Sequence, residues 1–184
     1  MSVDYIVASL PALGFDQPAS IGLAKFTEIA SDFAQNGKAG GDGDFAPGGK
    51  AREASDWLAT LLRKIGLFAK WNDLETQLRN AVAEARGGAK YLRPAEGCSL
   101  YWKNRVLACF QERDPLKRDE ALDRVWWDAA GEFTPPSAPL GAGALATYAI
   151  RLKIALKRDA ISRERGNAAF DRLTAATKRD SKGA

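Results

Sequence analysis

The sequence predicts an all-α protein, one compact domain of about five or six helices. Apolar residues recur at spacings of three and four along most of the 184-residue chain, as in helices with one buried face. No stretch alternates strand and helix patterns, so a parallel sheet is not expected. Hydrophobic residues make up 46% and charged residues 27% of the chain, which are ordinary values for a globular domain.

The N-terminal part predicts one ambiguous segment followed by one helix. Residues 4–11, DYIVASLP, contain β-branched and aromatic residues and form either a short strand or an extended apolar anchor, because Pro11 would interrupt a ladder. Ser20 is expected to cap the next helix, which ends near residues 36–37. The apolar positions of this helix are Ile21, Ala24, Phe26, Ile29, Ala30 and Phe33.

The middle of the chain predicts two consecutive helices. The first begins near Lys50 and breaks at Gly66. The second has Asn72 and Glu75 in the arrangement of a capping box, and it ends at residues 87–88, Gly-Gly. The two apolar stripes comprise Ala54, Trp57, Leu58, Leu61, Leu62 and Ile65, then Trp71, Leu74, Leu78 and Val82.

The C-terminal half predicts three further helical segments. Residues 101–110 have helical spacing, and Asp114 followed by Pro115 supplies a capping acid and a proline at the first helical position. The last helix is expected to continue or restart through Phe170 and Leu173. The buried positions are Leu122, Val125, Trp126 and Ala129 in the second segment, and Leu145, Tyr148, Leu152, Ala155 and Leu156 in the third.

We assign residues 1–177 to a single helical domain and residues 178–184 to a mobile tail. The glycine-rich residues 37–49 are predicted to form a flexible loop. A phosphate-binding loop is not favoured, since one residue too many separates Gly43 from Gly49 and Ala51 replaces the hydroxyl residue. A calcium loop is not favoured either, because the acidic pattern stops after two residues.

The residue content argues against an enzyme, a cofactor and a metal site. The chain contains no histidine, the commonest general base, and its two cysteines, Cys98 and Cys109, form no CxxC pair. The N-terminus lacks the basic region of a signal peptide, and no apolar run reaches membrane-spanning length. We therefore expect a cytoplasmic protein without membrane insertion, either free or peripheral at the inner face of the membrane.

The charge distribution leaves a second class of function open. The net charge is +4, and ten basic residues fall between residues 151 and 182. A basic end of this kind attracts acidic proteins, nucleic acid or anionic lipid. A basic helical module that binds nucleic acid or other proteins is therefore the alternative function, although the acids in the middle of the chain make nucleic acid the less favoured partner.

Four large side chains beside the apolar stripes are the candidate contacts for another protein. Trp127 adjoins Trp126, which fits the buried face, and adjacent helical residues point about 100° apart. Trp127 is therefore expected at the edge of the core or in an interface. The candidates are Trp127, Arg151, Arg158 and Arg79.

Three stretches together resemble one bacterial family of uncharacterised proteins. They are DYIVASLPALGFDQPASIGLAKF (residues 4–26), WNDLETQLRNAVAEAR (71–86) and LATYAIRLKIALKRDAISRERGNAAFDRL (145–173). Members of this family are encoded beside V-type ATP synthase genes and look like shortened relatives of the C subunit, which is named d in eukaryotic enzymes. The resemblance implies an all-α adaptor without catalytic residues, with the stalk and rotor-ring subunits of the V-type ATPase as partners.

Overall fold

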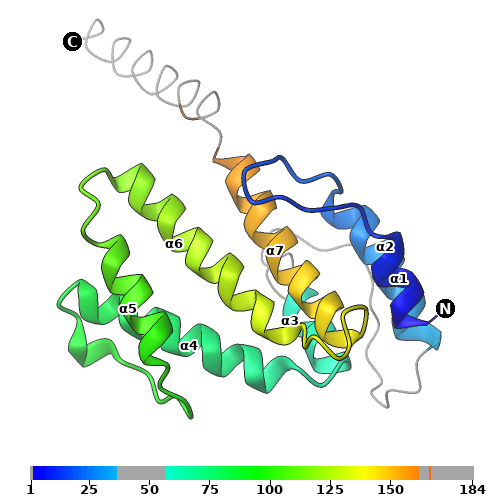
Figure 1. Cartoon of the computed structure of the whole chain (residues 1–184), viewed down its shortest axis with the longest axis horizontal. Helices are drawn as coiled ribbons and strands as arrows, with labels where there is room; N and C mark the ends of the chain where they lie inside the picture. The colour runs from blue at the N-terminus through cyan, green and yellow to red at the C-terminus, as the bar shows by residue number, and fades with distance from the viewer. Residues whose placement is uncertain (1, 37–56, 162–165, 167–184) are drawn as a thin grey trace, which may run out of the picture.

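A computed structural model describes residues 2–36, 57–161 and 166, and the regular structure in these ranges is entirely helical. The predicted all-α class is confirmed, and these ranges contain no strand (Figure 1). The elements are α1 (Val3–Ser9), α2 (Leu23–Asn36), α3 (Trp57–Lys64), α4 (Phe68–Ala85), the 3₁₀-helix η1 (Ala89–Tyr91), α5 (Leu100–Cys109), α6 (Pro115–Ala129), the 3₁₀-helix η2 (Ala130–Phe133) and α7 (Ala142–Ala160).

The N-terminal segment is a helix, which corrects the prediction of a strand or an extended anchor. Ser2 caps α1 by accepting a hydrogen bond from the backbone N–H of Tyr5. The helix ends at Ser9, and the capping residue Leu10 has an extended ψ of 137°, as expected for a residue before proline. Ile6 is fully buried because α1 packs on α2 and α7. This packing overrides the weak β propensity of the segment.

The helix that follows begins later than predicted. Helix α2 begins at Leu23. The hydroxyl of Ser20 donates a hydrogen bond to the carbonyl of Ala12 at 3.0 Å instead of capping the helix. Helix α2 reaches Asn36, the last described residue before the range 37–56, so its predicted end near residues 36–37 is not tested. The predicted loop at 37–49, the helix start near Lys50, the continuation through Phe170 and Leu173 and the tail at 178–184 lie outside the described residues.

Glycines mark the breaks after the two middle helices. Gly66 and Gly87 have φ of 73° and 74°, a conformation that favours glycine, and they follow α3 and α4 as predicted. The predicted capping box is wrong, because α4 starts at Phe68 and encloses both Asn72 and Glu75. Asp114 does cap α6, accepting a hydrogen bond from the N–H of Leu116 at 2.9 Å.

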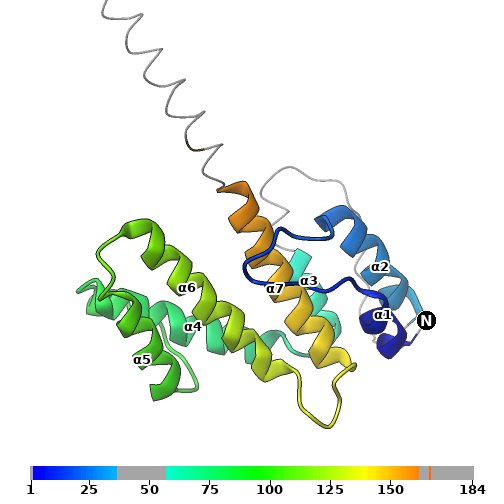
Figure 2. The same cartoon turned by 45° about the horizontal axis from the view of Figure 1, so that its top comes forward.

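Helix α7 lies at the centre of the fold. It has nine buried residues and contacts α1, α3, α6 and η2. Figures 1 and 2 show α1 and α2 on one side of α7 and α6 on the other, with α5 beyond α6. No helix within the described ranges has the length and apolar content needed to cross a bilayer.

Candidate functional site

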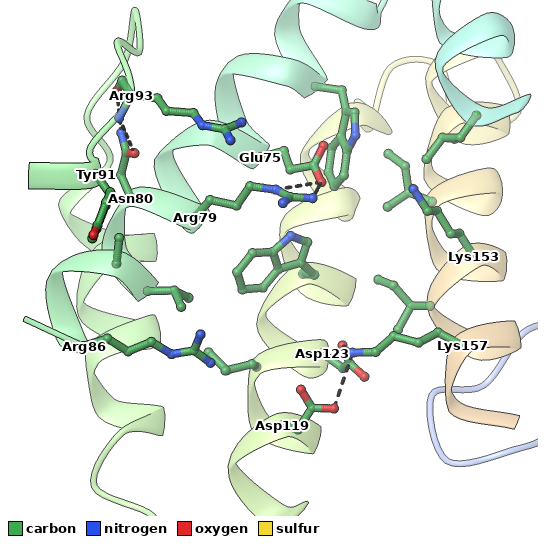
Figure 3. A pocket seen from close by; sticks show the side chains of 18 of the residues that line it. Glu75, Arg79, Asn80, Arg86, Tyr91, Arg93, Asp119, Asp123, Lys153 and Lys157 are labelled. Carbon is green, nitrogen blue, oxygen red and sulfur yellow. Dashed lines mark hydrogen bonds and ion pairs between the residues drawn. The ribbon is translucent and has the colours of Figure 1, made fainter. Parts of the chain in front are cut away.

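An open groove of about 810 Å³ lies between α4, α6 and α7 (Figure 3). Helix α6 contacts both α4 and α7, and the groove runs where these two helices flank it. Its base is apolar, and Trp126 of α6 lies there half-buried, packed against the core on one side. The other apolar lining residues are Leu58, Trp71, Val82, Ala83, Leu122, Ile150 and Ile154.

The walls of the groove carry basic side chains. Figure 3 shows Arg79 reaching inward from α4, and Lys153 and Lys157 reaching inward from α7. Arg79 is paired with Glu75 one turn earlier at 2.7 Å. In the described part of the chain, Lys153, Arg86 and Arg93 have no carboxylate within ion-pair distance. Three cations are therefore left for a ligand.

A pair of hydrogen bonds fixes one rim of the groove. The amide of Asn80 donates to the carbonyl of Arg93 at 2.8 Å, and the N–H of Arg93 donates back to the Asn80 side chain at 2.9 Å. These bonds attach the chain after η1 to α4 and place Arg93 at the groove.

An ion-paired cluster occupies the opposite end. The ammonium of Lys157 lies 2.7 Å from Asp123 and 3.4 Å from Asp119. Burial raises the pKa of Asp123 and is only partly opposed by Lys157, because the Asp123 side chain is 13% exposed. Partial burial lowers the pKa of Lys157, but the two carboxylates outweigh it and hold that pKa above its ordinary value. The cluster joins α6 to α7.

Lys157→Met is expected to raise the pKa of Asp123 further, because burial remains while the favourable ammonium is lost. A carboxyl whose pKa is raised in the folded state contributes less stability as pH rises through that pKa. The substitution should therefore destabilise the protein more at pH 7 than at pH 4. A ¹³C NMR titration of the Asp123 carboxyl and urea unfolding at the two pH values measure both effects.

Lys153→Met is the matched control, one turn earlier on the same helix and without a carboxylate partner among the described residues. It should leave the pKa of Asp123 nearly unchanged. An equal response of Asp123 to both substitutions would contradict the pairing.

The burial of the two adjacent tryptophans is the reverse of the burial that the sequence predicts. Trp127, expected at the core edge or in an interface, is buried with 7% of its surface exposed, whereas Trp126, expected in the core, is half-buried at the groove. The ring of Trp127 meets Phe15 edge-on at 5.5 Å. The segment between α1 and α2 therefore covers the side of α6 that had been expected to face outward.

One of the predicted arginines contacts this buried tryptophan, and another contacts Phe15, which packs on the tryptophan. Arg151 donates from Nε to the Trp127 carbonyl at 3.1 Å and places its guanidinium 5.2 Å from the indole ring, and burial lowers its pKa. Arg158 pairs with Glu120 at 3.1 Å and lies 3.9 Å from the centre of the Phe15 ring. Trp127 and Arg151 are thus in contact within the fold, and Phe15 links Arg158 to Trp127. Of the four predicted residues, Arg79 alone lines the groove.

The groove presents apolar and cationic side chains side by side. Its half-buried indole can contact apolar groups, and its unpaired cations can attract anionic groups. Within the described ranges, no three His, Cys, Asp or Glu side chains gather in an arrangement that could hold a metal ion. Sequence reasoning missed Trp126, Lys153, Arg86 and Arg93 as site residues. The available signal was the basic spacing along residues 151–158 beside an apolar stripe.

Comparison with protein-family models finds no match, and comparisons with curated proteins and with solved structures find none either.

Proposed function

We propose that this chain is a non-catalytic adaptor subunit of a V-type ATP synthase or ATPase, acting where the stalk meets the membrane rotor. The observation that carries the proposal is the groove, which offers the half-buried indole of Trp126 and unpaired cations to a partner. The three stretches of sequence that resemble the family supply the identity of the assembly. An all-helical body agrees with the all-α adaptor that this resemblance implies.

Contacts between segments far apart in the chain support a mechanical role. Arg124 donates from Nη2 to both carboxylate oxygens of Asp16 at 2.7 and 2.8 Å, and Asp159 accepts from the backbone N–H of Ala19 at 2.9 Å. These bonds tie the segment between α1 and α2 to α6 and α7. A protein that transmits torque needs helices coupled in this way, because loosely joined helices would yield under load.

The charges favour a protein partner over the alternative, nucleic acid. Lys157 is engaged by Asp119 and Asp123, and Arg158 is engaged by Glu120, so part of the basic C-terminal region is neutralised within the fold. The base of the groove is also apolar, and burying a charged phosphate against it costs free energy. A protein can cover the apolar base with apolar side chains and place acidic side chains against the basic walls.

Co-purification tests the proposal. We expect the chain, expressed with the stalk and rotor-ring subunits of the same organism's V-type ATPase, to co-elute with them in gel filtration at physiological salt and at about 1 M salt, where exposed charges are screened. Survival at high salt is expected because apolar contacts do not weaken under screening. Elution as a lone folded monomer under both conditions would contradict the adaptor function.

A further inference from the structure

We propose that the groove between α4, α6 and α7 binds a single amphipathic α-helix of a partner protein, with acidic residues beside its apolar stripe. The inference rests on the proposed adaptor function and specifies the contact that the adaptor makes. Its two supports are the shape of the apolar base and the charge of the walls.

The shape of the groove suits a helix. Its walls, α4 and α7, have 18 and 19 residues and flank α6, so the partner would lie on α6 as one more helix of a bundle. An α-helix with its side chains is about 10 Å wide and rises about 1.5 Å per residue. A partner helix of comparable length would place its apolar stripe on Trp126, Leu122 and Ile154, which is the helix-in-groove mode of recognition.

The charge of the groove indicates which residues should flank the apolar stripe of that helix. Five basic and three acidic side chains line the groove, and the acids are held by Lys157 and Arg79. The unpaired cations lie on both sides of Trp126: Lys153 comes from α7, whereas Arg86 is in the turn after α4. A helix with acidic residues on both sides of its stripe would pair with these cations, whereas a basic helix would meet uncompensated repulsion.

Two kinds of variant distinguish the contribution of the apolar base to binding from that of the charged walls. The double substitution Arg86→Glu and Lys153→Glu reverses the wall charge at two positions without a carboxylate partner among the described residues. Its matched control is Arg113→Glu with Lys117→Glu, an equal charge change at exposed positions that do not line the groove. Trp126→Ala removes the indole, and Tyr101→Ala removes an exposed aromatic ring from α5. Circular dichroism identifies any variant that fails to fold.

The first probe is a fluorescein-labelled synthetic helix of about 18 residues, roughly the length of the groove walls, with a leucine stripe flanked by glutamates. Its counterpart has lysine at every glutamate position. In anisotropy titrations of the full chain, the glutamate peptide should bind and the lysine peptide should bind at least about tenfold more weakly. The groove double variant should lose about tenfold in affinity for the glutamate peptide, whereas the control double variant should bind as the unaltered chain does.

Three results would overturn the inference. The first is equal binding of the two peptides. The second is unchanged binding of the glutamate peptide by both the groove double variant and Trp126→Ala. The third is self-association of the chain in sedimentation velocity that the groove double variant abolishes, since the occupant would then be a second copy.

The same variants in the co-purification experiment separate this inference from the adaptor function. Loss of co-elution in the groove double variant, with retention in its control, supports both. Co-elution that survives the groove double variant overturns the groove as the contact and leaves the adaptor standing. Absence of co-elution for every version of the chain, together with the predicted peptide preference, overturns the ATPase assignment and leaves the groove inference standing.

Discussion

Phe15→Ala is expected to lower the free energy of unfolding by about 3–4 kcal/mol. Phe15 lies outside any helix, yet only 7% of its surface is exposed. Its ring meets Trp127 edge-on, and the guanidinium carbons of Arg124 and Arg158 each lie 3.9 Å from the ring centre. Truncation removes the buried ring, leaves a cavity against Trp127 and deprives both arginines of a cation–π contact.

Urea unfolding followed by circular dichroism measures the effect of Phe15→Ala. Tyr5→Ala is the control, since Tyr5 is an aromatic residue of the same N-terminal region with 62% of its surface exposed. We expect the control to change the free energy of unfolding by less than about 0.5 kcal/mol. A loss below about 1 kcal/mol for Phe15→Ala would show that the segment between α1 and α2 does not help to hold α6 against α7.

Gly143→Ala is expected to destabilise the protein by about 2–3 kcal/mol, although alanine usually stabilises a helix relative to glycine. Gly143 lies in the first turn of α7, where a Cβ atom would come within 1.8 Å of the Phe133 carbonyl oxygen. Backbone atoms cannot rotate aside as a flexible side chain can. Either η2 or α7 must move, which strains the hydrogen bond from the Thr147 hydroxyl to the Ala130 carbonyl, now 2.7 Å long.

Thermal unfolding measures the effect of Gly143→Ala, and Gly22→Ala is the control. Gly22 lies immediately before α2, and a Cβ atom added there would meet no heavy atom within 4 Å. Gly22→Ala should leave the melting temperature unchanged or raise it slightly, whereas Gly143→Ala should lower it by several degrees. A melting temperature raised by Gly143→Ala would contradict the close approach of η2 to α7.

Local signals in the sequence predicted the elements that depend on local physics. Asp114 and Pro115 start α6 because the carboxylate and the proline ring act within the first turn. Gly66 and Gly87 mark breaks because their positive φ favours glycine wherever the rest of the chain lies. These features need no knowledge of distant residues.

Three features could not be predicted because distant segments decide them. The sequence of α1 has strand propensity, but packing on α2 and α7 makes it a helix. Trp126 and Trp127 are adjacent and equally apolar, and Phe15 decides which one is buried although it lies more than 100 residues away in sequence. The groove has the same origin, because it exists only once α4 and α7 have packed on either side of α6. Its unpaired cations can be identified only after their neighbours are known.

We propose that this groove holds a component of the V-type ATPase, and site-specific photo-crosslinking in cells tests that proposal. A photoreactive amino acid would replace Lys153 in the groove or, as the control, exposed Lys25 on α2. We predict that irradiation joins position 153, and not position 25, to a stalk or rotor-ring protein identified by mass spectrometry. Equal crosslinking from both positions, or none from position 153 to any component of the ATPase, would contradict the claim.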